Sequence, residues 1–292
     1  MEATNASSLR ALASKHLADA GSSLPHLEAD WIICHAAGVS RASLHAHPEM
    51  TVEGGLAELI ASLVARRAAG EPMAYITGIS TFCGRELRTD RRALIPRTET
   101  EILTAAADGY MKKIPGAGVF ADWCSGSGCI AVTLLEDNPA WRAFAVDSSR
   151  EALALAADNA ELRGVRGKIT FVECSNPAEC VDVIPLESLD LIVSNPPYVP
   201  KPDILTLESQ VRGYEPVVAL DGGSDGLDVC RLLLRELPRF MKKGAPLLLE
   251  TGGERQVRAL SSDGSGQGGL ELSSIFEDHR GIERFVVWLK SE

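Results

Sequence analysis

The stretch FADWCSGSGCIAV, residues 120–132, decides the fold of this chain. Its first residues are apolar, as in a buried strand, and Gly126 and Gly128 are typical of a tight turn, after which apolar residues continue as in a helix. Glycines at such a turn let the main chain approach a ligand closely, and the first N–H groups of the helix then point at that ligand. The stretch therefore predicts a strand, a ligand-binding loop and a helix in succession, although a tight turn without a ligand would look the same.

Strands and helices alternate along the chain on both sides of this loop. Strands are predicted at 117–122, 141–146, 168–173, 189–194, 244–250, 270–276 and 283–289. Helices are predicted between most of them, at 99–110, 128–137, 149–163, 227–240 and 253–261. This alternation predicts an α/β fold, in which a parallel sheet is covered on both faces. The last two strands follow a glycine- and serine-rich surface loop at 261–269 and are joined by the short DHRGI, so we expect a hairpin that leaves one strand antiparallel.

The N-terminal part of the chain has a different pattern. Apolar residues recur at helical spacing over 5–70, and each run ends at a glycine where a helix C-cap would lie. Shorter apolar runs with β-branched and aromatic residues then flank Gly84, which predicts a two-stranded hairpin. We therefore expect a small helical domain over 1–74, a β-hairpin linker over 75–97 and an α/β domain over 98–292.

The charge of the chain is acidic, since 29 Lys and Arg stand against 40 Asp and Glu, for a net charge of −11. Such a chain lacks the basic surface with which proteins grip the phosphates of duplex nucleic acid, so we expect no direct nucleic-acid binding. No run of about 18 apolar residues is present to span a bilayer. The first residues are acidic and polar where a secretory signal has a basic start and an apolar stretch. We therefore expect a cytoplasmic protein with no membrane contact.

Cysteine and histidine usage predicts no metal site. The seven cysteines are odd in number and contain no CxxC pair, so neither a disulfide framework nor a zinc ribbon is indicated. We expect reduced, mostly buried thiols. Five of the six histidines lie within the first 47 residues, with no acidic or thiol ligand at suitable spacing.

An acid stands at the end of the next predicted strand. This residue, Asp147 in AFAVDSS, offers two acceptor oxygens to the two hydroxyls of a ribose. Gly126-x-Gly128-x-x-Ala131, followed by this acid, also satisfies the dinucleotide fingerprint, so the nucleoside itself stays open at this point. A P-loop is excluded because Gly-Lys-Ser/Thr is missing. Asp122, before the loop, is either a second ligand acid or an N-cap and turn former.

The strand predicted at 189–194 ends in Asn195, Pro196, Pro197 and Tyr198. Prolines at a strand end are usually only a stop signal. Ligands in an open α/β sheet lie beyond the carboxyl ends of the strands, which brings this tetrapeptide beside the glycine loop. The Asn195 side-chain oxygen and the Pro196 carbonyl can then accept both hydrogens of a planar NH2 group, while Tyr198 covers that group and excludes water. This geometry suits methyl transfer from a sulfonium nucleoside to nitrogen better than hydride transfer.

These residues and the stretches around them resemble a known family. Besides SNPPYVP, the matching stretches are RRAAGEPMAYITG at 66–78, FCGREL at 82–87, LIPRTETE at 94–101, AVDSSREALALAADNA at 145–160 and YEPVVALDGGSDGLD at 214–228. The chain resembles the release factor glutamine methyltransferases, the PrmC/HemK family within the Asn-Pro-Pro-Tyr class of S-adenosylmethionine-dependent methyltransferases. The resemblance implies a helical domain that helps to grip the release factor, a β-hairpin linker and a Rossmann-like, seven-stranded sheet with one antiparallel strand. It also implies methylation of the side-chain amide of the glutamine in the Gly-Gly-Gln motif of peptide chain release factors.

The same resemblance assigns roles to residues. The cofactor-binding residues that it implies are Asp122, Ser125, Gly126, Ser127, Gly128, Asp147, Asn176 and Asn195. The residues that would hold the glutamine amide are Asn195, Pro196, Pro197 and Tyr198, and the catalytic ones among them are Asn195, Pro196 and Tyr198. Asn176 stands where an aromatic beside the adenine is frequent, so it either binds the base through its amide or is a plain turn residue. Three further positions depart from the family pattern, with Cys124 for a glycine, Thr98 for a proline and Ser175 for an acid.

Two other functions stay open. A methyltransferase acting on the exocyclic amino group of adenine or guanine in nucleic acid would use the same tetrapeptide, but the net charge of −11 and the lack of a basic recognition domain argue against it. A cofactor-binding protein without catalysis would serve as an interaction module. We expect a monomeric enzyme whose partner is a release factor.

Overall fold

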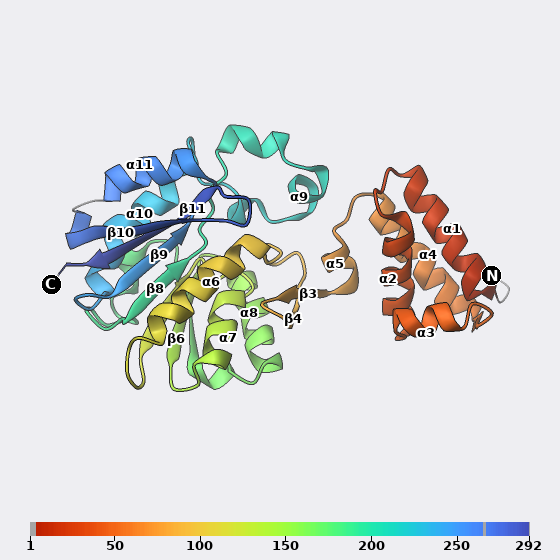
Figure 1. Ribbon diagram of the computed structural model, residues 1–292, viewed down its shortest axis with the longest axis horizontal. Helices are drawn as coiled ribbons and strands as arrows, with labels where there is room; N and C mark the ends of the chain where they lie inside the picture. Colours follow the sequence, from red (N-terminus) through yellow and green to blue (C-terminus); the bar gives the residue numbers. More distant parts are fainter. Residues whose placement is uncertain (1–3, 265–266, 292) are drawn as a thin grey trace. The chain divides into compact units, whose positions relative to one another are not determined.

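The computed structural model describes residues 4–264 and 267–291. Within them the chain divides into two compact units (Figure 1). The first unit contains the described residues up to Gly78 together with Glu208–Tyr214. The second contains Ile79–Leu207 and the described residues from Glu215 onward.

The first unit is built from helices. They are α1 (Ala6–Asp19), α2 (Pro25–Ala37), α3 (Arg41–Ala46), α4 (Gly54–Ala68), α5 (Met73–Thr77) and, from far along the chain, α9 (Ser209–Tyr214). Two short antiparallel strands accompany them, β1 (Thr4–Asn5) and β2 (Thr51–Val52). Leu17, Ile32 and Ile60 are buried in the apolar core of this unit, because their spacing places them on the inner faces of their helices. The helical N-terminal part is confirmed.

Two polar contacts in the first unit join segments that are far apart in the sequence. Glu28 on α2 is buried, and one of its oxygens accepts a hydrogen bond from Arg67 on α4 at 2.7 Å. This pairing removes the cost of an uncompensated buried charge. The Tyr214 hydroxyl on α9 donates to the main-chain carbonyl of Ala69 at 3.0 Å.

The second unit begins with a hairpin. Its antiparallel strands are β3 (Ile79–Phe82) and β4 (Arg85–Arg88). Gly84 takes up the left-handed backbone of the turn, with φ of 72°. Phe82 and Leu87 are fully buried in a core of this unit. The predicted hairpin is therefore present, while residues 75–77 of the expected linker form the end of α5.

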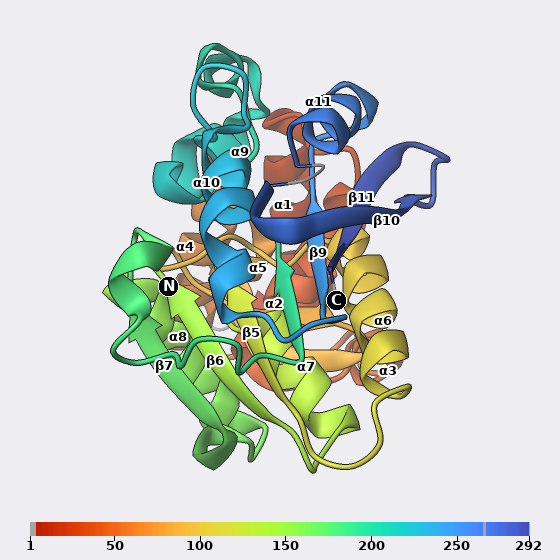
Figure 2. The ribbon, with the colours of Figure 1, turned by 90° about the vertical axis from the view of Figure 1, so that its left-hand side faces the viewer.

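The sheet of the second unit has seven strands. They are β5 (Val119–Trp123), β6 (Arg142–Asp147), β7 (Ile169–Glu173), β8 (Leu191–Ser194), β9 (Pro246–Glu250), β10 (Leu270–Glu277) and β11 (Glu283–Lys290). Their order across the sheet is β10-β11-β9-β8-β5-β6-β7 (Figure 2). β11 runs antiparallel to both β9 and β10, and the other pairs are parallel. The prediction of a seven-stranded sheet with one antiparallel strand is confirmed.

Helices cover both faces of this sheet (Figure 1). On one face lie α6 (Thr98–Met111), α7 (Cys129–Asp137) and α8 (Arg150–Leu162). On the other lie α10 (Asp228–Glu236) and α11 (Glu254–Gly264). Phe120 belongs to the first of these cores and Ala121 and Trp123 to the second, since successive side chains of a strand point to opposite faces. Burial on both faces is the reason why the central strands β5, β8 and β9 read as nearly continuous apolar runs.

Short 3₁₀ segments complete the connections. They are η1 (Arg166–Lys168), η2 (Pro177–Cys180), η3 (Lys201–Thr206), η4 (Val217–Ala219), η5 (Leu237–Phe240) and η6 (Gln267–Gly269). The expected surface loop at 261–269 is wrong in its first part, because buried Val257 and Leu260 anchor α11, which continues to Gly264. Residues 265–266 of that loop lie outside the described residues. Over the described ranges, no helix is both long and apolar enough to cross a membrane.

Candidate active site

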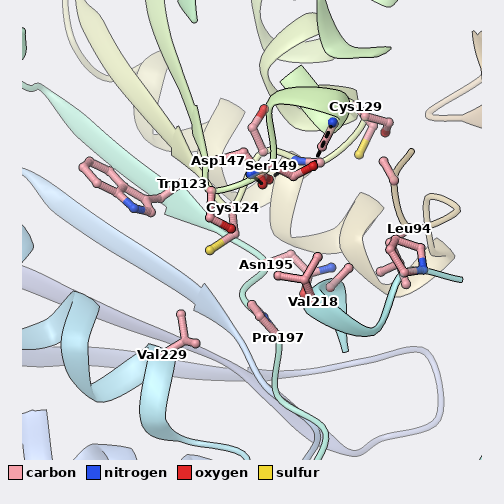
Figure 3. A pocket seen from close by; sticks show the side chains of 18 of the residues that line it. Leu94, Trp123, Cys124, Cys129, Asp147, Ser149, Asn195, Pro197, Val218 and Val229 are labelled. Carbon is pink, nitrogen blue, oxygen red and sulfur yellow. Dashed lines mark hydrogen bonds between the residues drawn. The ribbon is translucent and has the colours of Figure 1, made fainter. Parts of the chain in front are cut away.

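The candidate site lies where the strand order of the sheet reverses. β5 has β6 on one side and β8 on the other, and the crevice at such a switch point is where open α/β sheets bind ligands. A cavity of about 540 Å³ opens there, within the range of about 300–1,000 Å³ usual for small-molecule sites. Figure 3 shows Asp147, Asn195 and Pro197 around it. The predicted site residues that line the cavity are Ser125, Gly126, Ser127, Asp147, Asn195 and Pro197.

The glycine loop leaves β5 through three left-handed backbone positions. The φ angles are 58° at Cys124, 55° at Gly126 and 75° at Gly128. A Cβ added to Gly128 would lie 2.9 Å from the Cβ of Ala156, so this glycine also lets α8 approach the start of α7. Gly128 does not itself line the cavity.

Cys124, which stands where the resembled family has a glycine, takes up the left-handed conformation. Its φ of 58° strains a residue with a Cβ by about 1–2 kcal/mol. The side chain is half-buried, lines the cavity and packs against the apolar core. Burial raises the pKa of the Cys124 thiol well above its ordinary value, so this side chain stays neutral in the cavity wall.

Asp147 joins the end of β6 to the glycine loop. One carboxylate oxygen accepts the main-chain N–H of Gly126 at 2.8 Å, and the other accepts that of Ser149 at 2.9 Å. Burial raises the pKa of Asp147, and main-chain hydrogen bonds from Ser149, Gly126 and Ser148 offset part of that rise. A carboxylate has about four acceptor positions, so acceptor capacity remains for a hydroxyl group of a ligand in the cavity.

Asp122 lies behind the loop and does not line the cavity. It is fully buried, and its Oδ2 accepts the Ser125 hydroxyl and the Ala131 N–H, each at 3.1 Å. Its Oδ1 has no hydrogen-bond partner within the described residues. Burial raises the pKa of Asp122 to about 7, with nearby Asp147 adding to the rise. The geometry favours the turn-former role for Asp122, and its contact with a cofactor stays a prediction.

Asn195 belongs to a buried polar network that the sequence did not reveal. Its Nδ2 donates to the Thr100 hydroxyl at 2.9 Å, and that hydroxyl donates to Glu250 Oε2 at 2.8 Å. The Tyr198 hydroxyl donates to the other oxygen, Glu250 Oε1, at 3.2 Å. Glu250 is fully buried at the end of β9, and Thr100 is buried near the start of α6. Thr100 lies in the stretch LIPRTETE at 94–101, and its place in that stretch is the only feature of the sequence that pointed to Thr100.

The remaining members of the tetrapeptide are placed differently. Pro197 lines the cavity, whereas Pro196 and Tyr198 are not among its lining residues. The Tyr198 main-chain carbonyl accepts the side-chain amide of Gln256 at 2.8 Å. Burial raises the pKa of the Tyr198 phenol, with the Glu250 carboxylate adding to the rise, so the hydroxyl keeps its proton.

The segment after β7 differs from expectation in two ways. Asn176 does not line the cavity, and its side-chain oxygen instead accepts the Ala178 N–H at 3.2 Å, as a turn residue does. Its contact with the base therefore stays a prediction, while Cys174 and Ser175 beside it line the cavity. Cys174 and Cys180 are joined by a disulfide, so the expectation of reduced thiols is wrong for this pair. The turn through η2 brings together two cysteines whose spacing carries no recognised motif.

Two of the quoted stretches form another wall of the cavity. Arg97 pairs with the buried carboxylate of Glu215 at 2.6 Å, and Glu215 also accepts the Ile95 N–H at 3.2 Å. Residues 94–97 and 216–219 on either side of these contacts line the cavity. The ion pair therefore holds two segments of the wall together across more than a hundred residues of sequence.

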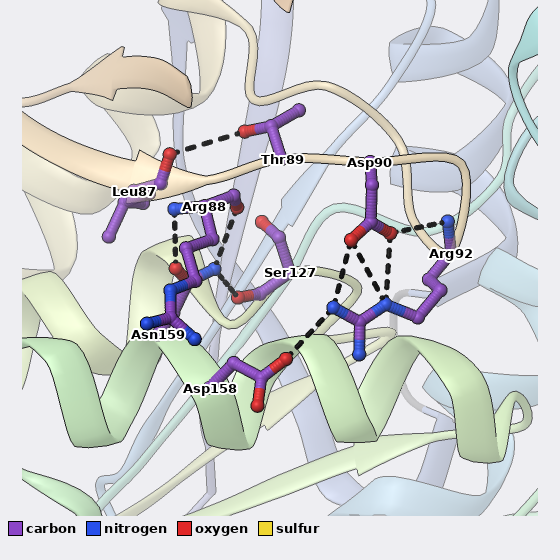
Figure 4. Close-up of polar contacts among 8 residues, drawn as sticks. All are labelled: Leu87, Arg88, Thr89, Asp90, Arg92, Ser127, Asp158 and Asn159. Atoms are coloured by element: carbon purple, nitrogen blue, oxygen red, sulfur yellow. Dashed lines mark hydrogen bonds and ion pairs between the residues drawn. The ribbon is translucent and has the colours of Figure 1, made fainter. Parts of the chain in front are cut away.

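Asn159 on α8 ties the hairpin to the glycine loop (Figure 4). Its Oδ1 accepts the Arg88 N–H at 2.7 Å, and its Nδ2 donates to the carbonyls of Arg88 at 3.1 Å and Ser127 at 2.9 Å. Asn159 is fully buried, so these contacts satisfy groups that water does not reach. Nearby, Arg92 bridges Asp90 and Asp158 at 2.8 Å each.

Comparisons with known proteins agree with this geometry. The PrmC N-terminal domain family matches residues 8–78, and the methyltransferase small domain family matches residues 104–206. The release factor glutamine methyltransferase of Geobacter sulfurreducens is 39% identical over 237 residues, which are 81% of this chain and 80% of that protein. That of Cereibacter sphaeroides is 37% identical over 281 residues, 96% of each chain. The solved hMettl16 catalytic domain in complex with MAT2A 3'UTR hairpin 6 shares the fold, with a TM-score of 0.54 and 13% identity over 84% of this chain and 86% of that one.

The sheet, the glycine loop with Asp147 and the tetrapeptide at Asn195 define an S-adenosylmethionine-dependent methyltransferase. The residues present fit this cofactor, because the cavity has the size of a cofactor site and Asp147 retains acceptor positions within it. The chain belongs to the release factor glutamine methyltransferase family. It is an enzyme of the transferase class.

Proposed function

We propose that this chain methylates the side-chain amide nitrogen of the glutamine in the Gly-Gly-Gln motif of peptide chain release factors. The observation that carries the proposal is that Asn195 and Asp147 line one cavity. Membership of the family supports the choice of glutamine over other planar NH2 groups. The tetrapeptide by itself would accept a glutamine amide or another planar NH2 group.

The residues of the chain contribute mainly positioning. S-adenosylmethionine supplies, when bound, a methyl group activated by the sulfonium. Ser125, Gly126 and Ser127 line the cavity and would hold its methionyl and ribose parts, with Gly128 shaping the loop, and Asp147 would accept the ribose hydroxyls. The side-chain oxygen of Asn195 and the carbonyl of Pro196 accept the two hydrogens of the substrate amide, which orients its nitrogen. Tyr198 covers the amide and excludes water.

No strong general base is required for this reaction. An amide nitrogen that has received a methyl group is acidic enough to lose its proton to water or to a nearby acceptor. Positioning and a pocket of low polarity would therefore account for most of the catalysis, since the positive charge of the sulfonium would be shared with the amide nitrogen during transfer and then lost with its proton.

We further infer a monomeric, cytoplasmic enzyme whose partner is a release factor and which does not bind nucleic acid directly. The net charge of −11 supports the last point, because phosphate binding needs a basic surface. The helical unit that the PrmC N-terminal domain family matches is the part of the chain that we expect to grip the release factor.

The rival function is methylation of an amino group in nucleic acid. The experiment that separates the two offers labelled S-adenosylmethionine to the enzyme with intact release factor, and in parallel with DNA, rRNA and tRNA. We expect label on the release factor and its loss when the Gly-Gly-Gln glutamine is replaced by alanine. Label on nucleic acid with none on the release factor would overturn the proposal.

A further inference from the structure

When Glu250 is ionised, the network around Asn195 determines where each of its hydrogens lies. Thr100 has one hydroxyl hydrogen, which it donates to Glu250 Oε2 at 2.8 Å. Tyr198 also has one, which it donates to Glu250 Oε1 at 3.2 Å. An ionised Glu250 accepts both and donates none. The Thr100 oxygen can then only accept from its remaining neighbour, Asn195.

This assignment determines which end of the Asn195 amide faces Thr100. The two ends have nearly the same shape, so packing alone does not distinguish them. Because Thr100 Oγ1 must accept, the NH2 group of Asn195 lies against it at 2.9 Å. The Oδ1 atom accepts no hydrogen bond from the described residues, and Asn195 lines the cavity. A reversed amide would set its own NH2 group against the NH2 group of a substrate.

We propose that Thr100 and Glu250 are positioning residues that orient the Asn195 side chain so that its oxygen accepts from the substrate amide. The proposal rests on the proposed function for the identity of that substrate. It adds two residues, on α6 and β9, that would act on the reaction through Asn195.

The charge of Glu250 controls this arrangement. Burial raises the pKa of Glu250 to about 7, and Glu99 on α6 adds to the rise, while hydrogen bonds from Thr100 and Tyr198 and the charge of Arg284 on β11 oppose it. A protonated Glu250 can donate its own hydrogen to Thr100. The Thr100 hydroxyl is then released to donate to Asn195, which favours the reversed amide.

The first test compares three variants of the full chain. Thr100→Val removes the hydroxyl at nearly constant shape, and we expect kcat to fall about 10- to 100-fold, as for a misplaced catalytic contact, with cofactor Kd changed less than about twofold. Thr100→Ser keeps the hydroxyl and should restore most of kcat. Thr104→Val is the matched control, because Thr104 is equally buried on α6 and donates to the Thr100 main-chain carbonyl at 2.8 Å. Wild-type kcat in Thr100→Val, or an equal loss in Thr104→Val, would overturn the proposal.

The second test uses Glu250→Gln. Wild-type kcat should rise as the pH increases through about 7, and this acid limb should vanish in the variant together with at least about a tenfold loss of kcat. If Thr100→Val fails to fold, the kcat and pH profile of Glu250→Gln test the proposal in its place. An unchanged pH profile at wild-type kcat contradicts the role given to Glu250.

A third readout does not depend on methyl transfer. The side-chain NH2 of Asn195 should exchange its hydrogens with water slowly in the wild type and markedly faster in Thr100→Val, as followed by NMR at a pH above 7. Equal exchange rates would overturn the proposal. A wild-type enzyme that leaves release factors unmodified would refute the proposed function, while the exchange rates would still report on the positioning of Asn195.

Discussion

The carboxylate of Asp147 accepts the main-chain N–H of Gly126 at 2.8 Å, although 21 residues separate them in the chain. The acid assigned to the ribose therefore also holds the glycine loop in place. This double role means that a change at Asp147 acts on both the ligand contact and the shape of the loop.

Replacement of Asp147 by asparagine should weaken cofactor binding. An amide NH2 group would face the N–H of either Gly126 or Ser149, and one acceptor would be lost from the cavity. We expect the Kd for S-adenosylmethionine to rise about 10- to 100-fold, equivalent to about 1.4–2.7 kcal/mol. Isothermal titration calorimetry measures this change, with the exposed Asp182→Asn as the control. Unchanged affinity in Asp147→Asn would refute the ribose role.

Replacement of Gly128 by alanine should lower the stability of the second unit by more than the strain of a left-handed backbone alone would lower it. The added Cβ would lie 2.9 Å from the Cβ of Ala156 on α8, in addition to the strain at φ of 75°. Gly164→Ala is a matched control, because Gly164 has φ of 71° and no atom within 4 Å of an added Cβ. We expect Gly164→Ala to lower the free energy of unfolding by about 1 kcal/mol and Gly128→Ala by about 2–4 kcal/mol in urea unfolding. Equal losses would show that α8 yields to the added methyl group.

Asn159→Leu should separate the hairpin from the glycine loop. The change keeps the size of the side chain but removes three hydrogen bonds. The N–H of Arg88, the carbonyl of Arg88 and the carbonyl of Ser127 each lose their partner. Unsatisfied buried groups cost about 1–3 kcal/mol each, so we expect a loss of about 3 kcal/mol or more in the free energy of unfolding. Cofactor affinity should fall as well, because Ser127 lines the cavity. A loss below about 0.5 kcal/mol would mean that water replaces the amide.

Stability should depend on pH through two buried acids. Burial raises the pKa of Asp122 from 3.8 and of Glu250 from 4.5, each to about 7. Between these ordinary values and about 7 the folded state binds protons that the unfolded chain has released. Their contribution to the free energy of unfolding is therefore complete below about pH 4 and is lost as the pH rises through about 7.

Asp122→Asn tests this dependence. The variant should lose less stability than the wild type between about pH 5 and about pH 8, because one of the two titrating groups is gone. Urea unfolding at both pH values gives the comparison, with Asp182→Asn again as the exposed control. Identical losses in wild type and Asp122→Asn would show that Asp122 is ionised throughout this range.

Local pattern accounts for most of the fold and for part of the site. The alternation of strands and helices predicted all seven strands of the sheet. The place of Asp147, the last residue of β6, beside the glycine loop follows from the ends of parallel strands meeting at one edge. The glycine loop was recognisable because left-handed backbone favours glycine. Cys124 shows the limit of that reasoning, since a non-glycine residue holds the same conformation at φ of 58°.

The amino-acid sequence by itself determined the class of fold, the loop, the acid and the tetrapeptide, because each depends on neighbouring residues and on the period of apolar positions. Only the tertiary structure decided how Asn195 is oriented. Its partner Thr100 is 95 residues away, and Glu250 lies 150 residues beyond Thr100, so no local pattern links them. The same holds for the disulfide between Cys174 and Cys180 and for the packing of α9 in the first unit. Such contacts depend on which side chains the packed sheet and helices bring within hydrogen-bond or bonding distance, and that is settled only when the whole chain has folded.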